Sequence, residues 1–391
     1  MKDVFIVSAT RTPVGKQKGF LREYLAPELL GAVLDESIRR VDLDPTLIDD
    51  VIAGTVYQVG EQGFTLARMG ILASKLIPET IPGVSVNRQC GSGLTAIQMA
   101  YAMIVSGTMD VVIAAGCELM SKYTMMADIN GILHTKEPMG NPFGPYYIEK
   151  YGQPNQIVAA QKIADKWGIT KEECMAFAID SHRKAHRATE KGYFKKEILP
   201  MKGLDKEGNE IVRDTDETIR PQTSVETLEA LKIIPGTDWI TAGLSSTITD
   251  GSSSIILMSE DKVRELNLTP MARIVANSVV GSDPELMLTG PIDVTPKILE
   301  KSGLTMNDID IFEVNEAFAP IPLAWKKEMS PDMKKVNVNG GALALGHPVG
   351  NSGCRLSVTA IHELIRRNAR YALVTLCTGG GMAPATLFER A

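Results

Sequence analysis

One pattern in this sequence occurs twice, and it restricts the fold more than any other feature. In each copy a Ser-Gly pair opens an amphipathic helical pattern, which leads to an apolar run typical of a buried strand. Three pairs of segments match at nearly one offset, and they are 43–49 with 304–310, 91–97 with 351–361, and 111–115 with 371–375. Since only one long period is present, the sequence predicts two similar halves rather than a solenoid.

Each half is predicted to be an α/β unit. Apolar runs such as Val111–Ala115 alternate with helical patterns, which favours sheets covered by helices on both faces. We expect the two halves to pack back to back. The run Val4–Val7 is predicted to be an edge strand, with a counterpart at Ala272–Val275 in the second half.

The duplication also suggests the domain organisation. The first half is expected to span residues 1–120 and to be completed by about 244–269, and the second half to span 270–391. Residues 121–243 have no partner in the other copy. We interpret this segment as an inserted loop domain, the usual place for substrate-binding elements.

Composition excludes several classes of partner. A formal net charge of −6 argues against a binding surface for nucleic acid or an anionic membrane, and no apolar run approaches the length of a membrane span. The five cysteines are scattered and contain no Cys-x-x-Cys pair, which favours a reducing compartment over a disulfide framework. The chain opens directly on an apolar strand pattern, and we expect no signal peptide. These features predict a soluble cytoplasmic protein.

Two cysteines stand where an apolar run breaks into glycines. Cys90 precedes Gly91 at a predicted strand-to-helix turn, where a helix N-terminus can lower the pKa of a thiol and backbone N–H groups can face an oxyanion. Cys377 ends the last long apolar run and precedes three glycines. Either cysteine could instead be a buried structural thiol. A nucleophilic thiol paired with a thiol acid would suit carbon–carbon bond chemistry through a thioester.

Three polar residues could complete such a site. His347 lies in a glycine-rich loop and, as a neutral imidazole, could deprotonate a thiol near neutral pH. Asn315 and Glu316 directly follow an apolar run. An amide there could orient a water or donate to an oxyanion, and the alternative for Asn315 is a helix N-cap.

A basic helical segment carries two further histidines. His182 and His186 are spaced as a metal-binding pair, but no third ligand is near and Arg183, Lys184 and Arg187 surround them. We therefore expect a solvated basic face without a metal. Together with Arg220, that face could bind phosphates.

Taken together, the motifs resemble those of the thiolase family, the acetyl-CoA C-acyltransferases, over essentially the whole chain. The matching motifs, in chain order, are Arg11–Gly15, Asn87–Gly93, Asn315–Phe318, Gly340–Gly350 and Cys377–Gly381. The resemblance implies a duplicated fold layered α-β-α-β-α with a loop domain over the coenzyme A (CoA) site. It also implies reversible cleavage of 3-oxoacyl-CoA to acetyl-CoA and a shortened acyl-CoA, or condensation of two acetyl-CoA.

The resemblance further implies a role for each site residue. Cys90 would carry the acyl group, His347 would activate it, and Cys377 would be the acid/base. A water held by Asn315 would stabilise an enolate with His347, Glu316 would orient the histidine loop, and the N–H groups of Cys90 and Gly379 would form a second oxyanion hole. Positions implied near CoA are Arg220, Ser246 and His182. CoA would be a substrate, no other cofactor is implied, and a homodimer or homotetramer is expected.

Two alternatives stay open at this point. A ketosynthase-type or hydroxymethylglutaryl-CoA-synthase-type condensing enzyme resembles the chain at the nucleophile but lacks the second cysteine. A non-catalytic subunit that binds acyl-CoA is the other alternative. The sequence leaves acyl-chain length, reaction direction and pathway open.

Overall fold

The computed structural model describes residues 3–131, 136, 138 and 140–391. The strands are β1 (Val4–Arg11), β2 (Gly15–Lys16), β3 (Asp50–Gly54), β4 (Gly83–Val86), β5 (Val111–Leu119), β6 (Met201–Leu204), β7 (Glu210–Arg213), β8 (Thr249–Ser259), β9 (Ala272–Gly281), β10 (Ile311–Val314), β11 (Tyr371–Thr375) and β12 (Met382–Arg390). The helices are α1 (Ala26–Arg39), α2 (Leu66–Ala73), α3 (Ser92–Val105), α4 (Pro145–Tyr151), α5 (Gln156–Lys166), α6 (Lys171–Glu190), α7 (Val225–Glu229), α8 (Glu260–Glu265), α9 (Gly290–Ser302), α10 (Pro320–Met329), α11 (Ala342–Leu345) and α12 (Ser352–Arg367). Short 3-10 helices are η1 (Pro45–Leu47), η2 (Gly60–Gln62), η3 (Ala242–Leu244), η4 (Met306–Asp308) and η5 (Met333–Lys335).

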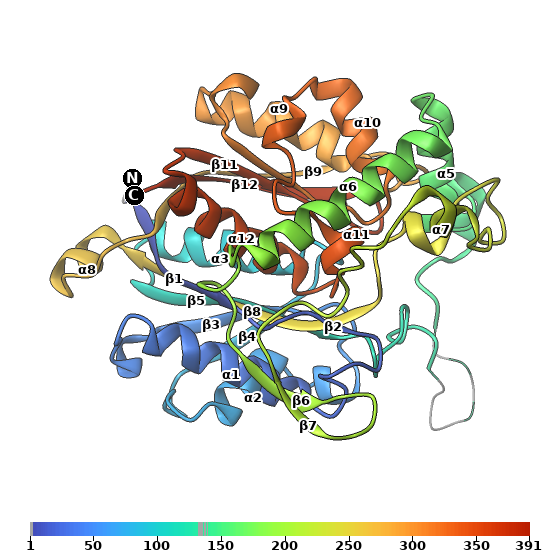
Figure 1. Cartoon of the computed structure of the whole chain (residues 1–391). Helices are drawn as coiled ribbons and strands as arrows, with labels where there is room; N and C mark the ends of the chain where they lie inside the picture. The colour runs from blue at the N-terminus through green and yellow to red at the C-terminus, as the bar shows by residue number, and fades with distance from the viewer. Residues whose placement is uncertain (1–2, 132–135, 137, 139) are drawn as a thin grey trace.

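Five layers of secondary structure are visible in Figure 1. Helices α9 and α10 cover the sheet region of β9, β11 and β12, and α1 and α2 cover the region of β1, β3, β5 and β8. Helices α3 and α12 lie between the two sheet regions. The predicted α-β-α-β-α layering of two duplicated halves is therefore confirmed.

The two sheet regions meet at β1. The prediction that this strand lies at an edge of the sheet is therefore wrong. The strand order is β10-β11-β12-β9-β1-β8-β5-β3-β4, so β1 lies near the middle. Its pairing with β9 involves only Phe5 with Arg273 and Ile6 with Ala272, whereas its pairing with β8 runs from Val4 to Arg11. An apolar run shows that a strand is buried, but it does not reveal a second neighbouring strand that pairs with it at only two residues.

The repeat in the sequence corresponds to equivalent elements in the two halves. Strands β1, β8, β5 and β3 correspond in order to β9, β12, β11 and β10, and η1 corresponds to η4. The central helices α3 and α12 approach closely at their first turns. A Cβ added to Gly353 would lie 2.2 Å from the backbone nitrogen of Leu94, and one added to Gly93 would lie 2.7 Å from that of Cys354. The repeated Ser-Gly pair is therefore needed for helix contact.

The segment between the halves packs on both of them. Helices α5 and α6 contact α10 and α11 of the second half. The β6–β7 hairpin reaches the first half, where Met201 joins the core beneath α1 and Tyr24 donates to the backbone carbonyl of Lys202 at 3.0 Å. The described residues between 121 and 243 thus contact both halves and lie along one side of the molecule (Figure 1).

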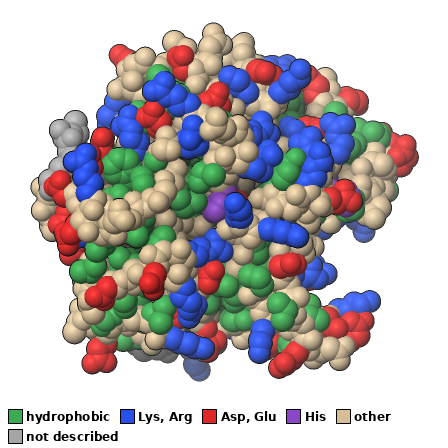
Figure 2. Space-filling model, turned by 60° about the vertical axis from the view of Figure 1, so that its left-hand side comes forward, with side chains coloured by type: hydrophobic (Ala, Val, Ile, Leu, Met, Phe, Trp, Pro, Cys, Tyr) green, Lys and Arg blue, Asp and Glu red, His purple; other side chains and the backbone are tan. Residues whose placement is uncertain are grey.

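The surface carries charges of both signs. Figure 2 shows lysine and arginine side chains interspersed with aspartate and glutamate side chains over one face. Among the described residues, no helix has the length and apolar character needed to cross a membrane.

Candidate active site

The first candidate cysteine lies in a strained turn between β4 and α3. Gln89, directly before Cys90, has a φ of 48°, a left-handed conformation that is uncommon for a residue other than glycine. The hydroxyl of Ser92 stabilises the turn by accepting from the backbone N–H of Arg88 at 2.9 Å and donating to the carbonyl of Gln89 at 2.6 Å. This turn directs Cys90, which is 6% exposed, into a cavity.

Burial controls the acidity of the Cys90 thiol. Desolvation raises its pKa to about 11, and the backbone N–H groups of Gly379 and of Cys90 itself offset part of that rise. The N–H of Cys90, just before the helix, acts on the pKa in the predicted direction, but burial outweighs it and the net pKa in the free protein is raised. The cost of burying a thiolate exceeds the stabilisation that these N–H groups provide, so a neighbouring base is needed for nucleophilic attack.

A tight turn brings His347 to the same cavity. Gly346, with a φ of 83°, precedes it, and a Cβ there would lie 2.4 Å from the methyl carbon of Thr249. The backbone N–H of His347 donates to the carbonyl of Thr247 at 3.2 Å. The glycine-rich run around His347 is thus explained by close packing against the strand end of β8.

Both ring nitrogens of His347 have a partner. Its Nδ1 lies 2.6 Å from the hydroxyl of Ser352, which in turn donates to the carbonyl of Pro348 at 2.9 Å. Because Ser352 has a single hydroxyl proton, both bonds form together when Nδ1–H donates to the hydroxyl oxygen. The unprotonated Nε2 then faces the Nδ2 of Asn315 at 3.3 Å. This tautomer leaves Nε2 available to accept a proton.

The charge state of His347 agrees with that arrangement. Burial lowers its pKa to about 3, and the positive charge of Arg355 acts in the same direction. His347 is therefore a neutral imidazole at any pH near neutrality, which is the form required of a base.

Cys377 lies beneath the cavity rather than in its wall. It follows β11 by two residues, is fully buried, and packs in an apolar cluster with Phe318 and Leu343. Burial raises its pKa, and a charge on Cys90 would raise it further, which shows that the two thiols share one local environment. Cys377 is thus held as a neutral thiol beside the first cysteine.

Glu316 is buried and forms hydrogen bonds that hold the segment leading to His347 in place. It accepts hydrogen bonds from the hydroxyl of Ser181 at 2.7 Å, the amide of Asn337 at 2.8 Å and the backbone N–H of Leu343 at 3.1 Å. A Cβ on Gly341 would lie 2.2 Å from the Cδ of Glu316, so the glycine makes room for the carboxylate. Glu316 does not line the cavity, and it acts on α11.

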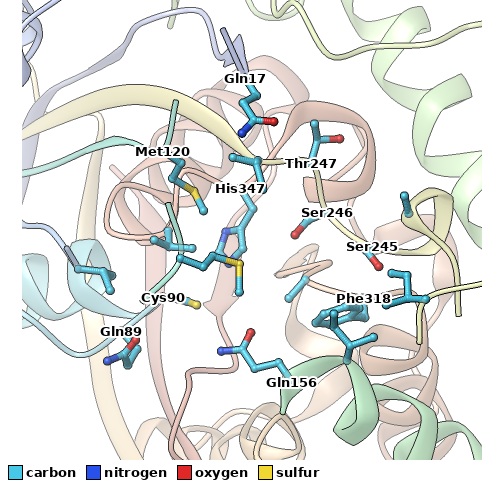
Figure 3. A pocket seen from close by; sticks show the side chains of 18 of the residues that line it. Gln17, Gln89, Cys90, Met120, Gln156, Ser245, Ser246, Thr247, Phe318 and His347 are labelled. Carbon is cyan, nitrogen blue, oxygen red and sulfur yellow. The ribbon is translucent and has the colours of Figure 1, made fainter. Parts of the chain in front are cut away.

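The cavity itself encloses about 360 Å³, a size typical of small-molecule sites (Figure 3). Figure 3 shows the side chains of Cys90, His347 and Gln156 directed toward its interior. Its apolar wall consists of Val56, Met120, Met125, Ile157, Ile234, Ala242, Ile248, Ala317, Phe318 and Val349. Its polar wall consists of Gln17, Tyr57, Gln89, Cys90, Gln156, Arg220, Ser245, Ser246, Thr247 and His347.

Of the three residues predicted near CoA, Arg220 and Ser246 line the cavity, and His182 does not. His182 is 6% exposed, and its Nδ1 accepts from the backbone N–H of Arg220 at 3.1 Å. Burial lowers its pKa to about 4. The prediction of a solvated face is therefore wrong for His182, because one side of α6 packs inward, while His186 pairs with Glu190 on the outer side. Within the described residues, no group of three or more His, Cys, Asp or Glu side chains is placed to hold a metal ion.

Two residues near the site were missed by sequence reasoning. Ser352 appeared only as part of the repeated Ser-Gly pair, and its contact with His347 depends on the turn between them. Glu118 is fully buried at the end of β5, where burial raises its pKa to about 7. A single acidic residue at the end of the otherwise apolar run Val111–Leu119 was a usable signal for it.

Comparison with known proteins agrees with this geometry. Residues 4–261 match the family description "Thiolase, N-terminal domain" and residues 268–390 match "Thiolase, C-terminal domain". The chain is 41% identical over 399 residues to a 3-ketoacyl-CoA thiolase of Cronobacter sakazakii, covering 100% of both chains. It is 39% identical to a steroid 3-ketoacyl-CoA thiolase of Mycobacterium tuberculosis, covering 100% of this chain and 95% of the relative.

Solved structures show the same relationship. The human mitochondrial 3-ketoacyl-CoA thiolase superposes with a TM-score of 0.90 at 34% identity, covering 100% of this chain and 99% of that chain. The acetyl-CoA acetyltransferase of Bacillus anthracis superposes with a TM-score of 0.91 at 36% identity, with the same coverage.

Fold, cavity and relatives together define an acyltransferase built on two duplicated α/β halves. More specifically, the chain belongs to the thiolase family. The alternative condensing-enzyme and non-catalytic readings are not favoured, since both halves match thiolase descriptions over their length.

Proposed function

We propose that the protein cleaves 3-oxoacyl-CoA with free CoA, giving acetyl-CoA and an acyl-CoA shortened by two carbons, and that it also runs the reverse condensation. The observation that carries this proposal is a cavity lined by the buried thiol of Cys90 and the neutral imidazole of His347, with a second buried thiol, Cys377, near enough that a charge on Cys90 raises its pKa. A nucleophile, a base and a separate acid are the groups that carbon–carbon cleavage through a thioester requires.

In the first half-reaction, Nε2 of His347 accepts the proton of Cys90. The thiolate attacks the C3 carbonyl, and the N–H groups of Cys90 and Gly379 stabilise the oxyanion. Collapse breaks the C2–C3 bond, and its electron pair passes to the acetyl unit as an enolate whose oxygen faces Asn315 and protonated His347. Cys377 donates its proton to C2, which releases acetyl-CoA. The raised pKa of Cys377 suits this step, because the thiol stays protonated until the carbanion forms.

In the second half-reaction, the thiol of an incoming CoA gives its proton to the Cys377 thiolate. The CoA sulfur attacks the thioester on Cys90, and Cys90 leaves as a thiolate. That thiolate takes back the proton held by His347, so the enzyme returns to its starting state. The shortened acyl-CoA is the second product, and no other co-reactant is required.

CoA is proposed to enter along the side of the cavity that carries Arg220 and Ser246. A local cation is needed there because the chain as a whole carries a net charge of −6 and does not attract anions. The apolar wall that includes Met120, Met125 and Phe318 is proposed to hold the acyl chain. The amount of apolar wall supports a substrate longer than acetoacetyl-CoA.

We further propose a homo-oligomer in the cytoplasm. Strand β4 ends the described sheet and pairs only with β3, and its Val84 is 38% exposed, which supports pairing with a second copy. All five cysteines are free thiols, which supports a reducing compartment. Size measurement by light scattering and fractionation of the producing cell test these two statements.

The reaction is tested by measuring CoA-dependent cleavage across 3-oxoacyl-CoAs from acetoacetyl-CoA to long and branched chains. Replacing the proposed acid, Cys377→Ala, should lower kcat by about 10²- to 10⁴-fold, the range of a general acid–base contribution. Cys174→Ala is the matched control, since Cys174 is a buried thiol of the same apolar cluster, and only the pKa of Cys377 is affected by a charge on Cys90. No cleavage of any substrate by the unmodified protein would refute the proposal, and full activity of Cys377→Ala would favour a decarboxylating condensation.

A further inference from the structure

A single buried carboxylate accepts hydrogen bonds from three segments beside the cavity. Glu118 is the second-to-last residue of β5 and is fully buried. The neighbouring strand β3 is parallel to β5, and its last paired residue, Gly54, lies opposite Gly116. The side chain of Glu118 therefore extends past the end of β3, at the carboxyl edge of the sheet where ligands bind in α/β folds.

All of the hydrogen bonds that Glu118 accepts come from segments at this edge. Its Oε2 accepts from the backbone N–H of Val56 at 2.8 Å and from that of Gly350 at 2.9 Å. Its Oε1 accepts from the backbone N–H of Tyr57 at 3.2 Å and from the amide of Gln62 at 2.7 Å. One carboxylate thus connects a loop of the first half with the loop that carries His347 in the second half.

Close packing around Gly350 fixes the position of its N–H relative to the carboxylate of Glu118. A Cβ on Gly350 would lie 2.4 Å from Oε2 of Glu118 and 2.5 Å from the Cα of Thr55. Gly350 therefore brings its N–H to the carboxylate by lacking a side chain. Without Glu118, four buried donors from two halves of the chain would lose their acceptor.

The connected segments surround the nucleophile. Val56, Tyr57, Met120 and Val349 form one apolar cluster with Cys90. Val56 and Tyr57 are the residues whose N–H groups bind Glu118, and Met120 follows it by two positions. Glu118 itself does not line the cavity, so it can act only through these neighbours.

We propose that Glu118 is a positioning residue that holds the 56–57 segment and the His347–Gly350 loop in a fixed relation to Cys90. This role rests on the proposed function, since the geometry that Glu118 maintains is that of base and nucleophile. Removing its carboxylate shifts His347 relative to Cys90 while the substrate-binding wall at Arg220 and Phe318 stays in place. The step that is slowed is formation of the acyl-enzyme, and substrate binding is little affected.

Glu118→Gln tests this role, because the new amide presents two donors to backbone N–H groups that need an acceptor. We expect kcat per folded active site to fall about 10- to 100-fold, the effect of a misplacement of about 1 Å, and KM to stay within about threefold. The rate at which iodoacetamide alkylates Cys90 should also change, because the residues around Cys90 move. Glu118→Asp keeps the charge but is too short to reach both segments, and it carries the test if the glutamine variant does not fold.

Asp35→Asn is the matched control, because Asp35 is also a buried carboxylate that accepts from a backbone N–H, that of Lys75 at 3.0 Å, and neither residue lines the cavity. This control should lose thermal stability and keep its kcat and KM per folded site. Unchanged kcat in both Glu118 variants, an equal fall in Asp35→Asn, or a change confined to KM would each overturn the proposal. Absence of cleavage by the unmodified protein would instead refute the proposed function.

Discussion

Replacing Ser352 with alanine tests how His347, the proposed base, is held in the tautomer that can accept a proton. The hydroxyl of Ser352 lies 2.6 Å from Nδ1 of His347, and it is the acceptor that allows Nε2 to be unprotonated. The alanine variant leaves a buried Nδ1–H without an acceptor. The ring can avoid this only by moving its proton to Nε2, and that tautomer cannot accept the proton of Cys90.

The size of the effect follows from burial. Leaving a buried donor unsatisfied costs about 1–3 kcal/mol, and each 1.4 kcal/mol corresponds to a factor of ten. Either the working tautomer is destabilised by this amount or the inactive one becomes populated. We therefore expect kcat/KM for thiolysis to fall about 10- to 100-fold in Ser352→Ala, with a parallel fall in the rate at which substrate acylates Cys90.

Helix α12 offers a matched control for this variant. Ser357 is also buried and donates to the carbonyl four residues earlier, that of Gly353 at 2.8 Å, as Ser352 does to Pro348 at 2.9 Å. Ser357→Ala should therefore lose about 1 kcal/mol in urea unfolding, and Ser352→Ala should lose this together with up to about 1–3 kcal/mol for the unsatisfied Nδ1–H of His347. Only Ser352→Ala should lose activity. Equal kcat/KM in the two variants would refute the tautomer argument.

Three further outcomes are expected. Because burial raises the pKa of Cys90 to about 11, its alkylation rate by iodoacetamide in the free protein should keep rising with pH up to at least pH 10, and a plateau near pH 7 would contradict that assignment. His182→Ala removes the acceptor for the backbone N–H of Arg220. The KM for CoA should therefore rise about threefold to tenfold, with kcat nearly unchanged. An unchanged KM would show that Arg220 does not need this hydrogen bond. Gly341→Ala places a Cβ 2.2 Å from the Cδ of Glu316. The variant should lose about 1–3 kcal/mol of stability, and its melting temperature and kcat should both fall. A fully stable variant would show that Glu316 is free to move.

Much of the architecture could be predicted because it follows from local pattern. The repeat of segments 43–49, 91–97 and 111–115 predicted two equivalent halves, and the alternation of apolar runs with helical patterns predicted helix-covered sheets. Whether a strand such as β1 lies at the edge or in the middle of the sheet was not predictable from local pattern. The hydrophobic pattern of β1 records that it is buried, but the number of strands beside it depends on how the halves meet.

Electrostatic properties of the site residues were the least predictable. The pKa of Cys90 depends on how completely the surrounding loops exclude water, and the helix N-terminus alone suggested the opposite direction. For His182, helical spacing placed it correctly on α6 but could not tell which side of the helix faces inward. The basic residues next to His182 in the sequence suggested that it is solvated. That suggestion was wrong, because Arg183 and Lys184 lie on other sides of the helix, where both pair with Asp180.

By itself, the sequence determined the duplicated α/β plan and singled out the candidate reactive groups, because the apolar periodicity and the glycine-flanked Cys90, His347 and Cys377 are properties of short segments. Only the tertiary structure decided the protonation states of these groups and the contacts that hold them. Desolvation depends on every segment that packs around a residue, and the bonds of Ser352 to His347 and of Glu118 to Gly350 form where distant or turned segments meet. Those contacts depend on the way in which the two halves are joined.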